Sequence, residues 1–404
     1  MTFRAPDCDV LVVGGGPVGL LTAYLCAGRG LSVILCEASA EPARDLRATS
    51  FHPPTLDLLE PSGLTEEISA RGMICPDWQI RLHPSGERAV FDLSVIADQT
   101  RHPFRLQCEQ WKLSEALAKR LEGHPGATLM RGQKVTGFAE EEDRVTVTIG
   151  TEQGDTGRLS ARVLVGADGW QSDVRQWLRI PFEGETFPET TVVVTTPFRF
   201  EDHLEGMSLV TSCWTRDSHV AFLRLPDMWR LALYPDEAVP IEDQSTPEAV
   251  EAILDDLVPV EGDHGVTAIW RYRVNQRCVP VYRVRRTALV GDAAHVNSPA
   301  GGLGLNAGIH DAFSLVEALV DIFKGGAPLE RLDAYDRQRR PVAQGILRQA
   351  GANRDRMRQK SEAERRASLR ELQAIAADPA RLKSFVLRAS MIEGLRSVGQ
   401  RWIV

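Results

Sequence analysis

The first clear hydrophobic pattern lies near the start of the chain, between Cys8 and Glu37. A short apolar run at Val10–Val13 is followed by a cluster of glycines, a helix-length apolar segment and a second apolar run that ends at Glu37. Short apolar runs beside glycine turns are typical of buried strands, and the longer segment between them is typical of a helix. The pattern therefore predicts a strand, a helix and a strand in succession, the unit from which parallel sheets are built.

The middle of the chain shows shorter, alternating segments. Between residues 72 and 97 such segments are punctuated by prolines and a glycine, which predicts a hairpin. Strands are predicted at 134–138, 145–149, 163–166 and 287–290, and helices at 111–121 and 246–257. The stretch from 190 to 234 is rich in Val, Thr, Phe and Trp, and it predicts a second, largely antiparallel sheet.

From Ala307 onward the pattern is mostly helical. Amphipathic runs are interrupted at Gly325–Gly326 and at Pro341, where we expect the helices to break. The order of elements predicts an α/β fold whose first domain is assembled from separated segments, with a β-rich insertion and a helical tail.

Composition and charge exclude several classes of function. The chain has 404 residues, of which 43% are hydrophobic and 25% charged, so it can bury a sizeable core. The formal net charge of −8 argues against a nucleic-acid partner. No apolar stretch approaches the roughly 18 residues of a membrane span, and no basic-then-apolar leader is present. We therefore expect a cytoplasmic protein without membrane association.

The cysteines point to a reducing environment and to no metal site. There are seven of them, scattered without a CxxC pair or a His/Cys cluster at metal-ligand spacing. We expect reduced thiols, several of them serving as small core residues.

The glycine cluster at the start of the chain is a GxGxxG motif placed between a strand and a helix. In such a motif the first glycine permits a tight turn, the second lets the backbone approach a pyrophosphate, and the third allows close helix packing. An acid about 20 residues further on accepts bonds from ribose hydroxyls, and Glu37 ends the next strand at a matching distance. The motif predicts a bound adenine dinucleotide at these residues: Gly14, Gly16, Pro17, Val18, Gly19 and Glu37.

Two further motifs narrow the cofactor. Gly291–His295 follows a predicted strand and leads into Pro299–Asn306, which opens a helix, and Ala167–Arg175 contains an Asp-Gly turn followed by Ser-x-x-Arg. With these motifs in this order, the chain resembles the class A flavoprotein monooxygenases, the p-hydroxybenzoate hydroxylase and phenol hydroxylase families, over roughly residues 8 to 345.

The resemblance implies FAD as the cofactor and assigns further contacts. The Asp of the GD motif, here Asp292, bonds the ribityl chain, and the Asp-Gly turn at Asp168 touches FAD. Arg47 matches a flavin-contacting arginine, and Gln107 matches a ribityl-contacting glutamine. The start of the following helix stabilises negative charge on the flavin pyrimidine ring through its amides, which here belong to Gly304, Leu305 and Asn306.

The same resemblance implies the domain organisation. We expect a Rossmann-like FAD-binding domain from residues 1–75, 99–180 and 277–345, and a mainly antiparallel β domain for the substrate from 76–98 and 181–276. Residues 346–404 form a C-terminal helical segment.

The implied reaction is a hydroxylation. In these families reduced flavin takes up O2 to give a C4a-hydroperoxide, whose distal oxygen passes to an electron-rich ring. The chain is thus expected to hydroxylate a small aromatic or heteroaromatic phenolic substrate with FAD, NAD(P)H and O2. No second GxGxxG is present, so NAD(P)H is expected to bind transiently near the flavin. The short architecture implies a monomer or a homodimer.

Four residues are candidates for the chemistry. Pro299 lies in the helix-entry loop, where its carbonyl is expected to face the substrate, although this loop has a purely structural interpretation too. Arg224 falls near a carboxylate-binding arginine of the benzoate-type enzymes, and a structural ion pair is an equal alternative. His52 and His219 are candidate bases for a phenolic proton, each with a structural alternative. His295 is expected to be structural.

Two other functions are weighed against hydroxylation. A flavin-dependent halogenase shares the GxGxxG, but the WxWxIP motif expected of that group is absent. A non-catalytic binding protein similar to the Rab GDP-dissociation inhibitors uses the same scaffold, but the intact motifs at Asp168 and Asp292 argue against it. The substrate ring, the position hydroxylated and the choice between NADH and NADPH are left open.

Overall fold

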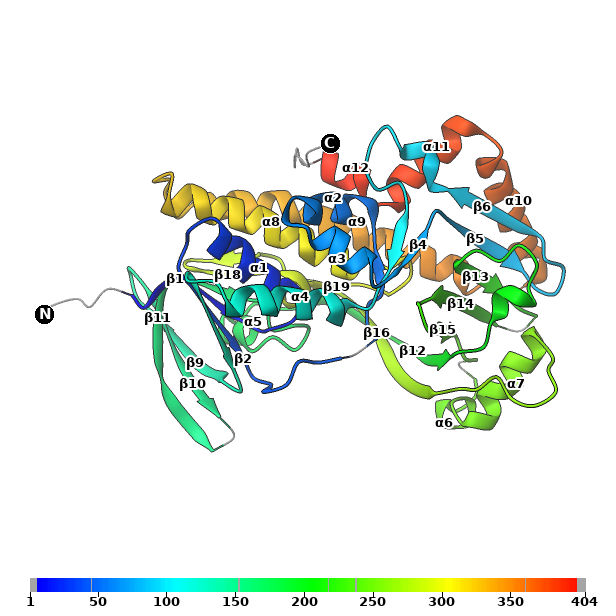
Figure 1. Ribbon diagram of the computed structural model, residues 1–404, viewed down its shortest axis with the longest axis horizontal. Coiled ribbons are helices and arrows are strands. Elements are labelled where there is room, and N and C mark those ends of the chain that lie inside the picture. The colour runs from blue at the N-terminus through cyan, green and yellow to red at the C-terminus, as the bar shows by residue number, and fades with distance from the viewer. Residues whose placement is uncertain are drawn as a thin grey trace, which may run out of the picture.

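Two sheets lie end to end, and one long helix, α9 (Arg331–Met357), packs against strands of both of them (Figure 1). The structure, a computed structural model, describes residues 6–44, 46–151, 153–216, 218–236, 238–359 and 361–397. None of the helices within these ranges is both long and apolar enough to cross a membrane.

The first sheet is mainly parallel and has the strand order β17-β18-β11-β1-β2-β8. Strand β1 lies between β11 and β2 and pairs with both in parallel, and its side chains are almost all buried. Strands β9 and β10 continue the sheet from β11 as an antiparallel ribbon. The bounds are β1 Cys8–Val13, β2 Val33–Glu37, β8 Ala127–Arg131, β9 Lys134–Glu140, β10 Val145–Thr151, β11 Gly154–Gly166, β17 Arg283–Val284 and β18 Thr287–Leu289.

The second sheet is mainly antiparallel and has the order β19-β16-β12-β15-β14-β13-β5-β6. The predicted hairpin, β5 and β6, joins this sheet because β5 pairs in parallel with β13. The placement of 76–98 with 181–276 agrees with this pairing, while the domain boundaries themselves stay a prediction. The bounds are β5 Asp77–Leu82, β6 Arg88–Asp92, β12 Glu183–Thr196, β13 Val210–Trp214, β14 His219–Arg224, β15 Trp229–Leu233, β16 Ala268–Cys278 and β19 His295–Val296.

A small third sheet, β3-β7-β4, lies beside the place where the other two sheets meet. Its strands are β3 Ser50–Phe51, β4 Met73–Cys75 and β7 Arg105–Gln107. The helices are α1 Pro17–Gly28, α2 Pro53–Leu59, α3 Leu64–Ser69, α4 Gln110–Glu122, α5 Asp173–Trp177, α6 Ile241–Gln244, α7 Pro247–Leu257, α8 Gly304–Phe323, α9 Arg331–Met357, α10 Glu362–Ala376, α11 Pro379–Ala389 and α12 Ile392–Arg396, with 3-10 turns η1 Glu60–Ser62, η2 Leu93–Ile96, η3 Phe200–Asp202 and η4 Gly291–Ala293.

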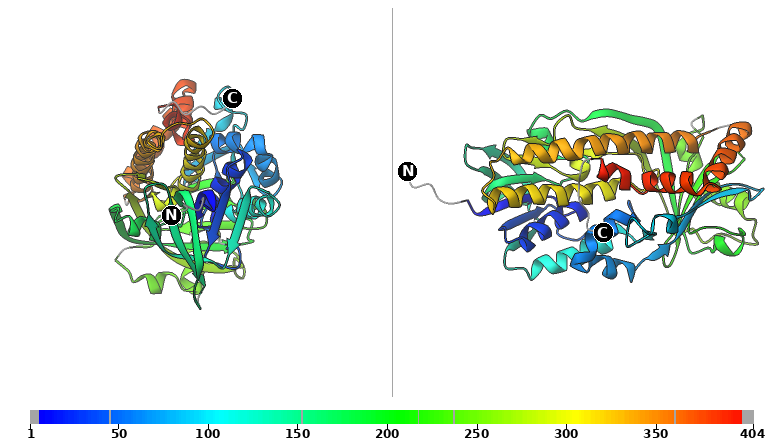
Figure 2. Two further views of the ribbon diagram at one scale, coloured as in Figure 1. Left: turned by 90° about the vertical axis from the view of Figure 1, so that its left-hand side faces the viewer. Right: turned by 90° about the horizontal axis from the view of Figure 1, so that it is seen from above.

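Helices α8 and α9 lie side by side along the long axis of the molecule (Figure 2). The predicted break at Gly325–Gly326 is confirmed, because it falls between them. The predicted break at Pro341 is wrong, since α9 runs through it. A proline inside a helix costs about 3 kcal/mol, and the buried face of α9, which includes Tyr335, Val342 and Ile346, offsets this cost by packing.

The C-terminal helices cover one end of the second sheet. Leu369 and Leu372 of α10 and Val386 of α11 form one buried cluster with Ile80 of β5 and Phe91 of β6. The expected helical C-terminal segment therefore packs onto the hairpin of β5 and β6 at this end of the molecule (Figure 1). The predicted fold, a Rossmann-like α/β domain with a mainly antiparallel sheet and a helical C-terminal segment, is confirmed.

A buried triad of Asp311, Arg339 and His295 joins α8, α9 and strand β19. One carboxylate oxygen of Asp311 lies 2.6 Å from Nε of Arg339, and the other lies 2.6 Å from Nε2 of His295. The second oxygen also accepts from the amide of Gly291 at 3.3 Å. All three side chains are buried. Burial alone would raise the pKa of Asp311, but Arg339 and His295 outweigh it and lower the pKa, so the group is a carboxylate.

We predict that Asp311→Asn destabilises the protein by about 3 to 5 kcal/mol, because it leaves the buried Arg339 guanidinium without its carboxylate. Chemical denaturation of the purified variant measures this loss. The matched control is Asp321→Asn, which removes an exposed carboxylate of α8 paired with Arg331 of α9. This surface pair should contribute less than about 1 kcal/mol. Equal losses in the two variants would contradict a structural role for the triad.

Candidate functional site

The glycines of the GxGxxG motif have different surroundings. Gly14 has a φ of +106°, and a Cβ there would overlap the backbone of Ala167 and Asp168. A Cβ on Gly19 would overlap the carbonyl oxygen of Gly14, so Gly19 allows α1 to approach the turn. A Cβ on Gly16 would meet no protein atom within 4 Å. The open space beside Gly16 is the room that a pyrophosphate needs at a helix start.

Glu37 stands at the end of β2 and faces this turn. Its carboxylate accepts from the backbone amides of Gly15 and Ser39. The turn and the acid are therefore joined directly, and Glu37 lines the same cavity as Gly14 and Gly16.

The three sequence motifs meet at one cavity of about 630 Å³. Asp168 reaches it from the end of β11 and Asp292 from the η4 turn after β18. The Oδ2 atom of Asp168 accepts from the amide of Val174, while its buried Oδ1 has no partner in the part of the chain that the structure describes. The predicted cofactor residues that line the cavity are Gly14, Gly16, Pro17, Val18, Glu37, Arg47, Asp168, Asp292, Gly304 and Leu305.

The start of α8 forms the far end of this cavity. Gly304 and Leu305 line it, and the first amides of a helix have no intrahelical acceptor. Asn306 does not line it, because its side chain bonds the amide of His52 and the carbonyl oxygens of Ser50 and Gly302. Asn306 thus fixes the segment around Ser50 against the helix start.

Gln107, expected at the ribityl chain, does not line the cavity either. It is buried behind Ser50, which lines the cavity, and its Oε1 atom accepts from the Ser50 hydroxyl at 3.0 Å. The glutamine that lines the cavity is Gln110, the first residue of α4. Its position after β7, at the start of a helix, is the signal that could have separated it from Gln107.

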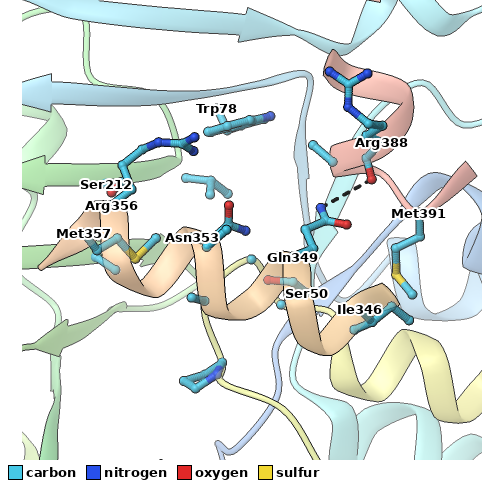
Figure 3. Close-up of a pocket in the computed structure, with 18 of the residues that line it drawn as sticks. Ser50, Trp78, Ser212, Ile346, Gln349, Asn353, Arg356, Met357, Arg388 and Met391 are labelled. Carbon is cyan, nitrogen blue, oxygen red and sulfur yellow. Dashed lines mark hydrogen bonds between the residues drawn. The ribbon is translucent and has the colours of Figure 1, made fainter. Parts of the chain in front are cut away.

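A second cavity of about 600 Å³ lies between the antiparallel sheet and the C-terminal helices. Figure 3 shows α9 along it, with Gln349, Asn353 and Arg356 directed inward and Trp78 on the opposite side. Other walls come from β13 to β16, from α11 and from the segment around α12. The lining is mixed, with Trp78, Trp214, Ile346, Phe385 and Met391 beside Ser212, Tyr234, Tyr272 and several arginines.

The two cavities share part of their walls. The residues that line both are Ser50, Leu223, Arg230, Pro299 and Gly302. The carbonyl oxygen of Pro299 accepts from the amide of Gly302 at 2.9 Å, which closes the turn between them. Pro299 thus lines both cavities, and the expected role of its carbonyl toward the substrate stays a prediction. We name these five residues the junction.

Arg230 is the arginine at the junction, and the sequence alone did not single it out as a site residue. Arg224, the candidate, lines neither cavity: it pairs with Glu201 at 3.2 Å and donates to the carbonyl oxygens of Pro226 and Met228. The expected anion-binding role of Arg224 therefore has no support in its surroundings. Arg230 pairs directly with Leu223, so these two side chains lie on the same face of the sheet, and both line the two cavities. Successive strand residues face opposite sides of a sheet, so Arg224 faces away.

The two histidine candidates also lie behind the cavity walls. Nε2 of His52 lies 2.9 Å from the carbonyl oxygen of Gly301, so this nitrogen donates. His219 shares a 2.6 Å hydrogen bond with Ser212, which does line the second cavity. Burial lowers the pKa of each histidine to about 3. Both are neutral at neutral pH, and neither lines the second cavity.

The residues around the first cavity fit FAD. The open space beside Gly16 admits a pyrophosphate, and the partnerless Oδ1 of Asp168 offers an acceptor. Burial by the surrounding protein raises the pKa of Asp292, and the nearby charges of His295 and Arg47 act against this effect. Charged side chains of both signs and the start of a helix thus surround one cavity.

Comparison with known proteins also indicates a protein that binds FAD. The family model described as FAD binding domain matches residues 7–350. Para-nitrophenol 4-monooxygenase of Pseudomonas sp. (strain WBC-3) is 32% identical, covering 97% of this chain and 98% of the relative. The 6-hydroxy-3-succinoylpyridine 3-monooxygenase of Pseudomonas putida is 32% identical over 82% of this chain and 84% of its own length.

A solved structure extends this likeness to the fold. The crystal structure of p-nitrophenol 4-monooxygenase from Pseudomonas putida DLL-E4 superposes with a TM-score of 0.88 at 30% identity, covering 96% of this chain and 98% of that one. A ternary complex of aklavinone-11 hydroxylase with FAD and aklavinone superposes with a TM-score of 0.76 at 26% identity, over 87% of this chain and 69% of that one.

We predict that Gly16→Ala and Gly19→Ala lose the cofactor for different reasons. The new methyl group at Gly16 projects into the cavity, so FAD affinity should fall while the unfolding temperature of the cofactor-free protein stays unchanged. The methyl group at Gly19 meets the Gly14 carbonyl, so the cofactor-free protein itself should be destabilised. Thermal unfolding without FAD and titration with FAD separate the two effects. A large loss of cofactor-free stability in Gly16→Ala would contradict the assignment.

We predict that stability falls as the pH drops from 7 to 5. In the unfolded chain a histidine binds a proton below about pH 6.5, whereas His52 and His219 have a pKa of about 3 in the folded protein. The unfolded state binds more protons in this window, so the stabilisation is complete above pH 6.5 and is lost below it. Each histidine should account for about 2 kcal/mol at pH 5.

The variant His219→Gln tests this assignment by removing the titration of His219. Denaturant unfolding at pH 7 and at pH 5 should show that its loss of stability between the two values is smaller than that of the wild type by about 2 kcal/mol. Parallel pH profiles for wild type and variant would show that His219 does not titrate as described.

Proposed function

Because this chain belongs to the FAD binding domain family and is an FAD-dependent aromatic monooxygenase, we propose that it hydroxylates a phenolic ring, carbocyclic or heteroaromatic, held at the junction. The observation that supports this proposal is the shared wall of the two cavities, formed by Ser50, Leu223, Arg230, Pro299 and Gly302. A group bound in the first cavity and a ring bound in the second would meet there. NAD(P)H and O2 are the co-substrates.

FAD would be held by residues on every side of the first cavity. The turn at Gly14–Gly16 and the start of α1 would face the pyrophosphate, and Glu37 the adenosine ribose. Asp292 and Gln110 would face the ribityl chain, and the amides at Gly304 and Leu305 the pyrimidine edge. When bound and reduced, FAD supplies the activation of O2 that the protein side chains cannot supply.

Arg230 is the residue that we propose for polarising the substrate. It is 5% exposed, its Nε atom donates to the carbonyl oxygen of Leu46 at 3.0 Å, and its side chain lines both cavities. A cation within about 4 to 6 Å of a phenol favours the phenolate. A phenolate is a more electron-rich ring, so this contact prepares the substrate for oxygen transfer.

The remaining walls hold the ring and exclude water. Pro299 and Gly302 place backbone rather than side chains at the junction, which leaves room beside the cofactor. Large apolar side chains such as Trp78, Trp214 and Ile346 cover the opposite side. Exclusion of water limits the side reaction in which peroxide is released without hydroxylation of the ring.

Two alternatives receive less support. The relatives named above are monooxygenases, so neither halogenation nor cofactor-free binding is favoured. The assignment as a monomer or homodimer stays a prediction.

We expect the holoprotein to oxidise NADH or NADPH faster in the presence of its substrate and to add one oxygen atom to the ring. A panel of phenols, hydroxybenzoates and hydroxypyridines, with nicotinamide absorbance and product mass as readouts, tests this. Peroxide measurement in the same assay separates coupled hydroxylation from uncoupled oxidation. A protein that binds FAD but adds oxygen to no member of the panel would contradict the proposed substrate class.

A further inference from the structure

Arg105 is a buried arginine without a counter-ion in the wall of the substrate cavity. It belongs to β7, it is 6% exposed, and it lines the second cavity but not the first. Within the described residues its guanidinium has no carboxylate partner and no hydrogen-bond acceptor, and its Nε atom is buried without a partner. The face of Trp78 lies against the guanidinium, with 5.0 Å between Cζ and the ring centroid.

This arrangement is costly unless an anion completes it. A guanidinium presents five donors and stays charged in proteins, and buried charges are paired in native structures. Burial lowers the pKa of Arg105 to about 10, so the group is still protonated at neutral pH. Trp78 is itself fixed by stacking on Phe91, with 4.2 Å between ring centroids. The cation is therefore held in place, with its hydrogen-bonding capacity unused.

The charges around the cavity agree with this reading. The charged residues that line it are five arginines and one acid: Arg105, Arg230, Arg348, Arg356, Arg388 and Glu393. Figure 3 shows Arg356 reaching from α9 toward Trp78. Such a surplus of one sign attracts an anionic ligand into the cavity.

The size of the cavity leaves room for a charged substituent. A cavity of roughly 150 Å³ is sufficient for benzene, and this one measures about 600 Å³. Arg230 lines both cavities, whereas Arg105 lines the second cavity alone. A ligand that fills the second cavity would therefore meet two arginines at separate places, Arg230 at the junction and Arg105 away from it.

We propose that Arg105, supported by Trp78 and Arg356, is a carboxylate-binding residue, and that the natural substrate is a phenolic ring carrying an acidic side group. This inference rests on the proposed function and narrows its substrate class. The carboxylate takes no part in the oxygen transfer. Its contact with Arg105 fixes the direction of the ring, so that the phenolic end lies at the junction.

The test compares acids with their neutral amides on the oxidised holoprotein. The probes are 2-, 3- and 4-hydroxybenzoate and 4-hydroxyphenylacetate, each paired with the amide of the same shape. Binding is measured from the perturbation of flavin absorbance, without NAD(P)H, so that the readout does not depend on turnover. For at least one pair we expect the acid to bind about 10- to 100-fold more tightly than the amide, as a charge-assisted hydrogen bond implies.

Variants identify the residue responsible. Arg105→Met should reduce the preference for that acid to about unity and leave amide binding within a few-fold, while Arg105→Lys should keep part of the preference because it keeps the charge. The matched control is Arg81→Met, which removes an equally buried guanidinium from β5 that does not line the cavity. Its acid preference should equal that of the wild type. If Arg105→Met does not fold, two other measurements replace it. The proposal then requires a reduced acid preference in Arg105→Lys and acid binding by the wild type that weakens as salt is added; an unchanged preference in Arg105→Lys contradicts it.

The outcomes separate this inference from the proposed function. A wild-type protein that hydroxylates phenols but binds no acid more tightly than its amide overturns the inference and leaves the function intact. An unchanged acid preference in Arg105→Met also overturns it. A holoprotein that adds oxygen to no phenol in the turnover panel, yet shows the acid preference, overturns the function and leaves an anion-binding cavity.

Discussion

The buried triad of Asp311, Arg339 and His295 is the interaction on which the geometry of the site depends. It joins α8, α9 and the loop that carries Asp292, and the same carboxylate accepts from the amide of Gly291. A buried ion pair is not by itself evidence of stability, because the desolvation of its members opposes their attraction. Its effect here is positional, since a carboxylate with fixed partners on both oxygens allows one arrangement of the three elements.

That arrangement sets the distance between the cofactor residues and the substrate cavity. The loop from Gly291 to Gly304 leaves the parallel sheet, contributes β19 to the antiparallel sheet, and returns to begin α8. Pro299 and Gly302 lie within this excursion and line both cavities. The junction therefore includes residues of a segment whose first part, Gly291 to His295, is bonded to the Asp311 carboxylate and whose last residue begins the helix that carries Asp311.

The sequence allowed the cofactor cavity to be predicted far better than the substrate cavity, and the reason is physical. Each cofactor motif is a local strand-turn-helix unit, so its spacing alone fixes which residues face the ligand, as at Gly14 and Asp168. Arg230 could not be separated from Arg224 in this way, because both lie on strands and only the register of β14 with β15 decides which side each one faces. A one-residue difference in a strand reverses the direction of the side chain.

The sequence did not predict that the helix lining the substrate cavity is continuous, and the reason is again that long-range contacts determine the structure. Pro341 is a helix breaker in sequence terms, yet α9 continues through it and carries Asn353 and Arg356 to the cavity. The lost hydrogen bond is local, whereas the packing that offsets it comes from α8, α12 and the sheet, which are distant in sequence. Long-range packing of this kind leaves no pattern in the residues around the proline.

Arg230 shows how the two cavities are coupled through one side chain. Its Nε atom is held by the carbonyl oxygen of Leu46, and the next residue, Arg47, lines the cofactor cavity. A segment that lines the first cavity thus fixes a cation that lines both cavities. Because electrostatic interactions are strong in a buried site, negative charge on either side of the junction is stabilised by the same guanidinium. A ring that brings its own charge to Arg105 leaves Arg230 free for the phenolic oxygen, and this division of roles requires two arginines at separate positions in one cavity.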